Sequence, residues 1–367
     1  MGFDQGKLTF RICRLPEPLP KDAVERFAAD HAQSLEHVTG DPLWGWVTTR
    51  HLLDTNITED TVKLGSYYHI CLRQAVRKIP ASLLQAECRI QELSKMEAEG
   101  RETLNKKERR AIKEEVKEDL LPKMPPQLSG IYVAIDTVEQ LLFTTATSQH
   151  ALDVFLGMFS KAMGFEPTVL TPDVAASELF HVDAESIPSF CISPELNAPD
   201  GEENGTVGQN FLTWLWYFQE ERGGKLPQSK LGEFGLMLDG PMTFVSEGTG
   251  ALESVVRKGS PVVSAEAKAS LLVGKKLKSA RVILARAEQE WSCQVDADEF
   301  VFRGLKLPEG EAMDPQSIFE ERMTNLYIFH SVFFGLYQKF LGEMSDGKKL
   351  ADYRKKAKNW VANREGR

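Results

Sequence analysis

The sequence predicts an α+β fold, in which a strand-rich centre of β-β-α units carries a protruding αα-hairpin and an inserted smaller module. Two observations predict the two kinds of element. Short runs of alternating apolar residues, typical of strands, occur near both ends of the chain. Between them, residues 81–121 contain no proline and one glycine, and are rich in Ala, Leu, Glu, Lys and Arg, which favours helix. A third observation, the acidic and Gly-rich run Asn197–Gln209, marks the inserted module.

The first strand is predicted at Lys7–Leu15. Its apolar side chains alternate with Thr9, Arg11 and Cys13, which is the pattern of a strand buried on one face. A second strand is predicted at Tyr67–Arg73.

A long helical hairpin is predicted over Ala81–Leu121, with the break between its helices near Gly100–Asn105. Helical spacing predicts a narrow apolar seam between the two helices. The residues assigned to that seam are Leu83, Ala86, Ile90 and Leu93 on the first helix and Ile112, Val116 and Leu120 on the second.

Strands followed by a helix are predicted twice. Strands within Ile131–Thr145 precede a helix at His150–Met163, and strands within Ser279–Leu305 precede a long helix near Pro315–Leu341. The order suggests two related units, although no residue-level match accompanies it.

The aromatic cluster in Phe211–Phe218 is expected to form local core rather than to stack on bases. The predicted division is a strand-rich centre and base (1–80, 123–175 and 275–342), a hairpin tip (81–122), an inserted module (176–274) and a basic tail (343–367).

Composition restricts the function classes. The 367 residues carry a net charge of −9, which lowers the expectation of nucleic-acid binding without excluding it, because charge can segregate between surfaces. The five cysteines form no CxxC pair, as in a reducing compartment. No apolar run is long enough for a membrane span and no signal core begins the chain, so we expect a cytoplasmic protein.

Catalytic signatures are weak throughout. The runs at Gly274-Lys275 and at Gly248–Gly250 lack the rest of a phosphate-binding or dinucleotide fingerprint, and the histidines have no metal-ligand spacing. Pro172-Asp173 with Glu266-Ala-Lys268 mimics a metal-dependent nuclease pattern, but both pieces are common in a chain with 53 acidic residues. We therefore expect no catalytic residue, no metal site and no cofactor.

A basic stripe is predicted on the second helix of the hairpin. Its members fall at i, i+3, i+4, i+7 and i+11, which is one helical face, while most acidic residues fall opposite. The stripe comprises Lys106, Arg109, Arg110, Lys113 and Lys117. Such a face can follow a phosphate backbone, or it can serve only solubility and i,i+4 pairing.

Two further sets of basic residues are candidates for DNA contact. Lys107 and Lys123 accompany the stripe, and a second cluster brackets a helix predicted at Ser264–Val273. That cluster comprises Arg257, Lys258, Lys275, Lys276 and Lys278. Ordinary solvated loops are an equally good interpretation of the second cluster.

Several pieces in fixed order resemble the RdgC family. They are KLTFRICRL (Lys7–Leu15), GWV (Gly45–Val47), YYHICLRQAVRKIP (Tyr67–Pro80), the charged hairpin (Met96–Pro122), IDTV (Ile135–Val138), Arg257–Lys276, Ala280–Pro308 and Asp314–Leu341. The chain differs from the family near residues 190–250, which look expanded, and after Leu341.

The resemblance implies a ring-shaped homodimer that encircles duplex DNA with little sequence preference, associates with the nucleoid and restrains RecA-driven recombination. It also implies that a helical tip and a base each contact the partner subunit. Lys106, Arg109, Lys113 and Lys123 are similar in position to basic residues of the family's hairpin, and Arg257 to one at the start of its finger-like segment. Here Gly259 and the residues after it replace further basic residues, which weakens the expectation of a DNA-inserting finger.

Sequence-tolerant binding of double-stranded DNA is thus the leading expectation. A metal-dependent DNA exonuclease, a label that the family has also carried, is the enzymatic alternative. A protein-interaction scaffold without DNA affinity is the third.

Overall fold

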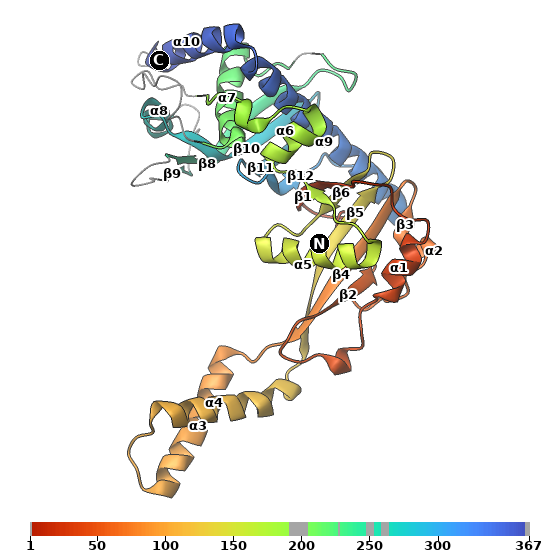
Figure 1. Ribbon diagram of the computed structural model, residues 1–367, viewed down its shortest axis with the longest axis vertical. Coiled ribbons are helices and arrows are strands. Elements are labelled where there is room, and N and C mark those ends of the chain that lie inside the picture. The colour runs from red at the N-terminus through yellow and green to blue at the C-terminus, as the bar shows by residue number, and fades with distance from the viewer. Residues whose placement is uncertain (1, 191–204, 227, 247–252, 258–263, 364–367) are drawn as a thin grey trace.

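The computed structural model describes residues 2–190, 205–226, 228–246, 253–257 and 264–363. Helices and one large antiparallel sheet share this part of the chain, which confirms the α+β class. The molecule is elongated, with the helical hairpin at one end and the C-terminal helix at the other (Figure 1).

The strands are β1 (Leu8–Arg14), β2 (Leu43–Thr48), β3 (Lys63–Leu64), β4 (Tyr67–Arg77), β5 (Pro126–Asp136), β6 (Leu141–Thr144), β7 (Thr168–Val169), β8 (Gly235–Val245), β9 (Ser254–Val256), β10 (Lys276–Arg286), β11 (Gln289–Asp296) and β12 (Val301–Lys306). The helices are α1 (Ala23–Ala29), α2 (Glu59–Val62), α3 (Ala81–Glu99), α4 (Lys106–Leu120), α5 (Gln149–Met163), α6 (Pro172–Phe180), α7 (Val207–Arg222), α8 (Ala265–Leu272), α9 (Pro315–Met344) and α10 (Gly347–Asn363).

The sheet runs in the order β2-β4-β5-β6-β1-β12-β11-β10-β8-β9. Its two halves meet at β1, which pairs with β6 through Arg11–Arg14 and with β12 through Leu8 and Phe10. The predicted strands are confirmed, as are the helices that follow β6 and β12.

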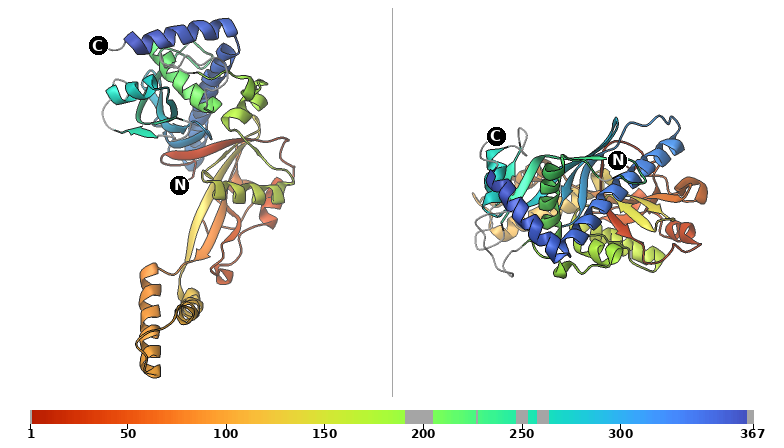
Figure 2. Two further views of the ribbon diagram at one scale, coloured as in Figure 1. Left: turned by 60° about the vertical axis from the view of Figure 1, so that its left-hand side comes forward. Right: turned by 90° about the horizontal axis from the view of Figure 1, so that it is seen from above.

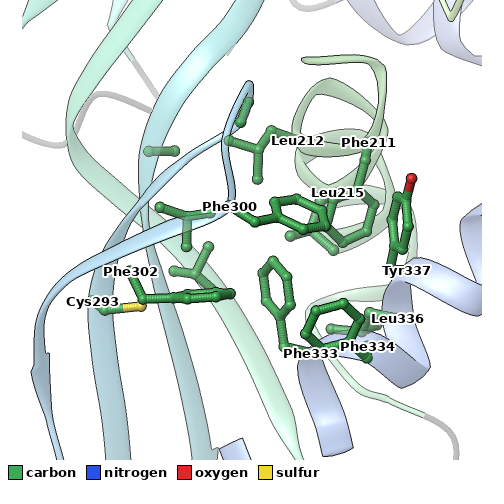
Figure 3. Packing of buried hydrophobic residues seen from close by; sticks show 14 of the residues in the cluster. Phe211, Leu212, Leu215, Cys293, Phe300, Phe302, Phe333, Phe334, Leu336 and Tyr337 are labelled. Atoms are coloured by element: carbon green, nitrogen blue, oxygen red, sulfur yellow. The ribbon is translucent and has the colours of Figure 1, made fainter. Parts of the chain in front are cut away.

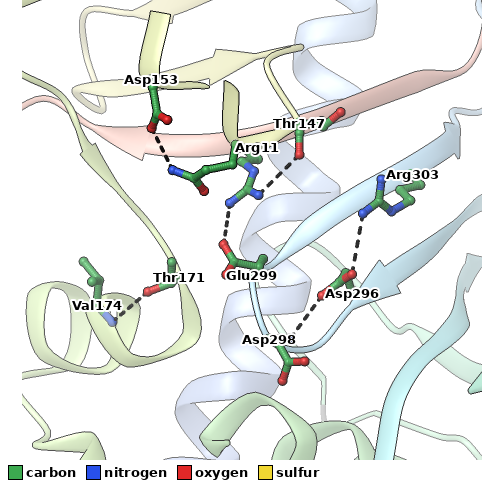
Figure 4. Close-up of polar contacts among 10 residues, drawn as sticks. Arg11, Thr147, Asp153, Thr171, Val174, Asp296, Asp298, Glu299 and Arg303 are labelled. Atoms are coloured by element: carbon green, nitrogen blue, oxygen red, sulfur yellow. Dashed lines mark hydrogen bonds and ion pairs between the residues drawn. The ribbon is translucent and has the colours of Figure 1, made fainter. Parts of the chain in front are cut away.

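The expectation that β1 is buried on one face only is wrong. Cys13 is fully buried and Arg11 is only 4% exposed, because the strand lies in the middle of the sheet and is covered on both sides. The guanidinium of Arg11 is compensated by the Glu299 carboxylate at 2.7 Å and by the Thr147 carbonyl at 3.3 Å (Figure 4).

Two apolar cores lie on the sheet. One packs α1 and α5 against β2, β4, β5 and β6, and the other packs α6, α7 and α9 against the C-terminal strands. In the second core Phe300, Phe302, Phe333 and Tyr337 meet edge to face (Figure 3). Phe300 has a left-handed φ of 45°, so its packing offsets local backbone strain.

The aromatic cluster of α7 belongs to this second core, as expected. Trp214 and Phe218 are fully buried, and Tyr217 is 2% exposed. Because α7 packs on β10 and β8 pairs with β10 from Gly235 to Val245, this part of the expected inserted module shares the sheet and core of the base. Residues 197–204 of the acidic run lie outside the described residues.

The C-terminal tail forms the helix α10. Its Leu350 is 6% exposed, and the Tyr353 ring meets the Tyr217 ring at 5.7 Å. The helix is therefore attached to the end of the molecule opposite the hairpin, as both Figure 1 and Figure 2 show.

Candidate nucleic-acid interface

The hairpin is carried away from the body by two long strands. β4 and β5 pair without interruption from Tyr67–Asp136 to Arg77–Pro126, and α3 and α4 continue from their far ends (Figure 1). At this junction the Arg77 guanidinium donates to the carbonyls of Val38, at 2.9 Å, and Met124. The hairpin is thus fixed at its base while most of its surface remains free.

Local sequence determines the turn of the hairpin. Gly100 ends α3 with a left-handed φ of 62°, a conformation that glycine adopts without strain. Asn105 caps α4: its side chain accepts from the Glu108 N–H, and the Glu108 carboxylate accepts from the Asn105 N–H, both at 2.9 Å. Arg101 lies 2.6 Å from Glu108, and this hydrogen bond holds the pKa of the Glu108 carboxyl below its usual value.

The apolar seam was predicted correctly for α4 and wrongly for α3. Ile112 and Val116 are buried, but Ile90 and Leu93 are 59% and 48% exposed. The residues packed in the seam are Leu84, Cys88, Met96, Leu104, Ile112, Val116 and Leu120. α3 has a second apolar face on nearly the opposite side of the helix, about 170° around at ~100° per residue, and spacing alone does not tell which one meets α4.

The predicted basic stripe lies on the surface. Lys106, Arg109, Arg110 and Lys113 are exposed, and none of them forms an ion pair with another described residue. Lys117 is half-buried and pairs with Glu114 at 2.9 Å, which lowers the pKa of that carboxyl. Four cations therefore remain available on one face of α4.

Lys107 and Lys123 are exposed but lie apart from the stripe. At ~100° per residue, Lys107 is about 120° from Lys113 and shares its side of α4 with Glu114 and Glu118. Lys123 ends the 3₁₀ turn that follows α4, near the base of the hairpin.

The structure also brings Arg89 of α3 beside the stripe, which sequence reasoning missed. Arg89 and Lys113 line one groove of about 620 Å³ between the two helices. Arg89 contacts Glu92 at 3.4 Å. A single arginine on α3 gives no periodic signal, so only the packing of the hairpin shows that the two cations are neighbours.

The second basic cluster is only partly a surface. The helix predicted between its members is present as α8. Arg257 is exposed, Lys278 is half-buried and Lys258 lies outside the described residues. Lys275 Nζ donates to Ser254 Oγ at 2.5 Å.

Lys276 requires a correction, because it was expected among the exposed cations. It is 4% exposed, and its Nζ donates to Asn210 Oδ1 at 2.7 Å and to Ser189 Oγ. Lys276 begins β10 and is buried, whereas Lys275, just before the strand, is partly exposed, so the run Lys275-Lys276 does not present both amines to one surface.

The two basic regions do not form one site within a single chain. The hairpin lies at one end of the long axis, and β9 and α8 lie toward the other (Figures 1 and 2). In Figure 1 the hairpin and the β9–α8 end both lie to the left of the central strands, so the chain is curved.

Among the described residues, no group of three or more His, Cys, Asp or Glu side chains could hold a metal ion. The nuclease-like residues Asp173 and Glu266 lie in the first turns of different helices, α6 and α8. The described cysteines Cys13, Cys71, Cys88 and Cys293 are free thiols, and Cys191 lies outside the described residues. No described helix is both long and apolar enough to span a bilayer.

Comparison with known proteins matches residues 16–179, which include the whole hairpin, to the family described as "Putative exonuclease, RdgC". This part of the chain is similar to the RdgC family. The Recombination-associated protein RdgC of Pseudoalteromonas atlantica is 30% identical over 146 residues, which are 39% of this chain and 48% of that protein. The protein of the same name from Aeromonas hydrophila is 24% identical over 169 residues, or 45% of this chain and 54% of the relative.

The chain thus spans about half the length of these curated RdgC relatives. The matched RdgC segment contains β2–β7, α1–α5, all but the last residue of α6 and the basic stripe, whereas α7, the second basic cluster and α10 lie outside it.

Proposed function

We propose that the chain binds double-stranded DNA without strong sequence preference and acts in recombination. The observation that carries this proposal is the set of four exposed, unpaired cations along α4, on a hairpin that projects from the body and lies within the RdgC match. Cations at successive turns of one helix face can contact successive phosphates, and such contacts carry no sequence information.

Assembly as a homodimer is the second part of the proposal. The face of α3 turned away from α4 exposes Ile90 and Leu93, with Ala86 also exposed between them and the base of the hairpin. A contiguous apolar face on a monomer marks an interaction surface, and a second copy of the same hairpin is its natural partner in a two-fold dimer.

Two curved chains joined at their ends would enclose a ring with basic residues on the inside. Encirclement retains a protein on DNA even where each phosphate contact is weak, which accommodates the net charge of −9. Occupation of duplex DNA by such a ring would restrain RecA, which is the role that we infer for it.

The test is a DNA-binding measurement on a charge-reversed hairpin. Changing Lys106, Arg109, Arg110 and Lys113 to Glu should abolish the binding of a duplex at low salt, with the circular dichroism spectrum unchanged. A matched control reverses four exposed lysines elsewhere on the described surface: Lys21, Lys63, Lys161 and Lys306. Equal loss in both variants would show that net charge alone is responsible and would contradict the hairpin interface.

The two alternatives give different results. End-labelled DNA incubated with Mg²⁺ or Mn²⁺ should stay intact, whereas processive degradation that a single Asp or Glu variant abolishes would establish the exonuclease. No retardation of DNA at low salt would instead favour the protein-interaction scaffold.

A further inference from the structure

A hollow of about 290 Å³ opens in the middle of the sheet, between β1 and β5. It exists because β6, which lies between these strands, ends at Thr144, while β1 and β5 both continue past that point. The residues that line it are Lys7, Leu8, Thr9, Gly130, Tyr132 and Thr145.

Two threonine hydroxyls at the hollow are able to act as hydrogen-bond donors. Thr145 Oγ1 already accepts the Tyr132 N–H at 2.9 Å, and Thr9 Oγ1 accepts the Gly304 N–H at 2.9 Å. A hydroxyl has one proton, and neither proton is committed to another described residue. Each hydroxyl can therefore donate its proton to a ligand that supplies acceptor oxygens.

Tyr132, whose side chain carries a phenol, also lines the hollow. Burial raises the pKa of this phenol above its ordinary value, and the nearby Cys71 and Asp4 raise it further. The hydroxyl consequently stays protonated at neutral pH and remains able to donate.

Lys7 supplies the charge. Its side chain is exposed and forms no ion pair within the described part of the chain. The nearest acid on the same loop, Asp4, also acts on Arg322, whose guanidinium donates to the carbonyls of Phe3 at 2.7 Å and Gly6 at 2.6 Å. Lys7 is the one cation among the described residues that line the hollow.

We propose that this hollow binds one phosphodiester group of the DNA backbone, an inference that rests on the proposed function. A phosphodiester has acceptor oxygens and a single negative charge, which matches three hydroxyl donors and one lysine. The start of β1 lies between the hairpin and the β9–α8 end along the length of the molecule, so the contact would fall between the two basic regions (Figures 1 and 2).

The experiment measures duplex affinity of the full chain as a function of salt concentration by fluorescence anisotropy. Lys7→Ala should make the slope of log affinity against log salt shallower by about 0.9 for each hollow that contacts a phosphate. Tyr132→Phe keeps the ring, should weaken binding about fivefold and should leave the slope unchanged, because it removes a neutral donor. Lys21→Ala, an exposed lysine remote from the hollow in sequence, is the control and should behave as the parent chain.

The site would be overturned if Lys7→Ala kept the salt slope of the parent chain and Tyr132→Phe kept its affinity. The charge-reversed hairpin tests the proposed function separately. If the parent chain binds no duplex, the proposed function fails, and inorganic phosphate becomes the probe. A rise in Tm with phosphate over chloride at equal ionic strength, lost in Lys7→Ala, would then overturn the phosphodiester assignment in favour of free phosphate. No rise would overturn the site itself.

Discussion

Lys276 Nζ lies 2.7 Å from Asn210 Oδ1, so this amine links β10 to α7 inside the base. Lys275 and Lys278 nearby retain side chains that reach the surface at least in part. One sequence run of three lysines therefore serves two purposes, and substitutions in it should separate stability from DNA affinity.

Lys276→Ala is expected to lower the free energy of unfolding by on the order of 3 kcal/mol, because it removes a charged donor and leaves Asn210 Oδ1 and Ser189 Oγ without it. Urea denaturation measures the change. Lys278→Ala, at a half-buried position on the same strand, should lower the free energy of unfolding much less. Equal stability of the two variants would contradict the buried position of Lys276.

Position around α4 should decide how much each lysine contributes to DNA binding. Lys113→Glu, within the stripe, should weaken binding markedly more than Lys107→Glu, although both substitutions change the net charge equally. The measurement is duplex affinity at one fixed salt concentration. Equal effects would mean that α4 contributes only through its total charge.

The apolar face of α3 should control the oligomeric state. Ile90→Glu with Leu93→Glu should convert a dimer to a monomer, because both side chains are about half exposed in the single chain and would be covered in a dimer. Sedimentation velocity measures the mass, and circular dichroism should be unchanged. Leu84→Glu is the contrasting variant: it enters the α3–α4 seam and should unfold the hairpin instead.

The sequence predicted elements better than their environments. The strands, the hairpin, its turn and the long helix α9 follow from periodicity and capping residues, which act locally. Other features depend on which elements lie next to each other. They are the burial of Arg11 in a strand covered on both faces, the face of α3 that packs against α4, and the inward direction of the Lys276 side chain. The hollow beside Lys7 also depends on where β6 ends relative to two strands distant in sequence, so no local pattern could reveal it.

The cap of α4 should determine the local stability of the hairpin. Asn105→Ala removes the acceptor for the Glu108 N–H and should cost about 1 kcal/mol. Hydrogen exchange should accelerate in the first turns of α4 and remain unchanged in β4 and β5. Asn105→Asp restores an acceptor and should recover the protection, whereas equal exchange in both variants would argue against the cap.

Acid should loosen the contact between α9 and the N-terminal half of the sheet, because two histidines are buried there. The His69 ring stacks on Phe319 at 4.5 Å, and the His330 ring lies 6.4 Å from Phe143 and 4.8 Å from Phe334. Burial lowers the pKa of His69 to about 3 and that of His330 to about 4. His69 Nε2 and both ring nitrogens of His330 have no hydrogen-bond partner among the described residues.

The folded pKa values lie below the unfolded value of about 6.5, so the unfolded chain binds these protons first as the pH falls. The stabilisation is complete above pH 6.5 and decreases by about 1.4 kcal/mol per pH unit for each histidine, down to the folded pKa. His330→Leu should reduce this slope between pH 6.5 and 4.5 in urea denaturation, while His150→Leu, at an exposed position, should not. An unchanged slope in His330→Leu would show that the ring is accessible to protons in the folded state.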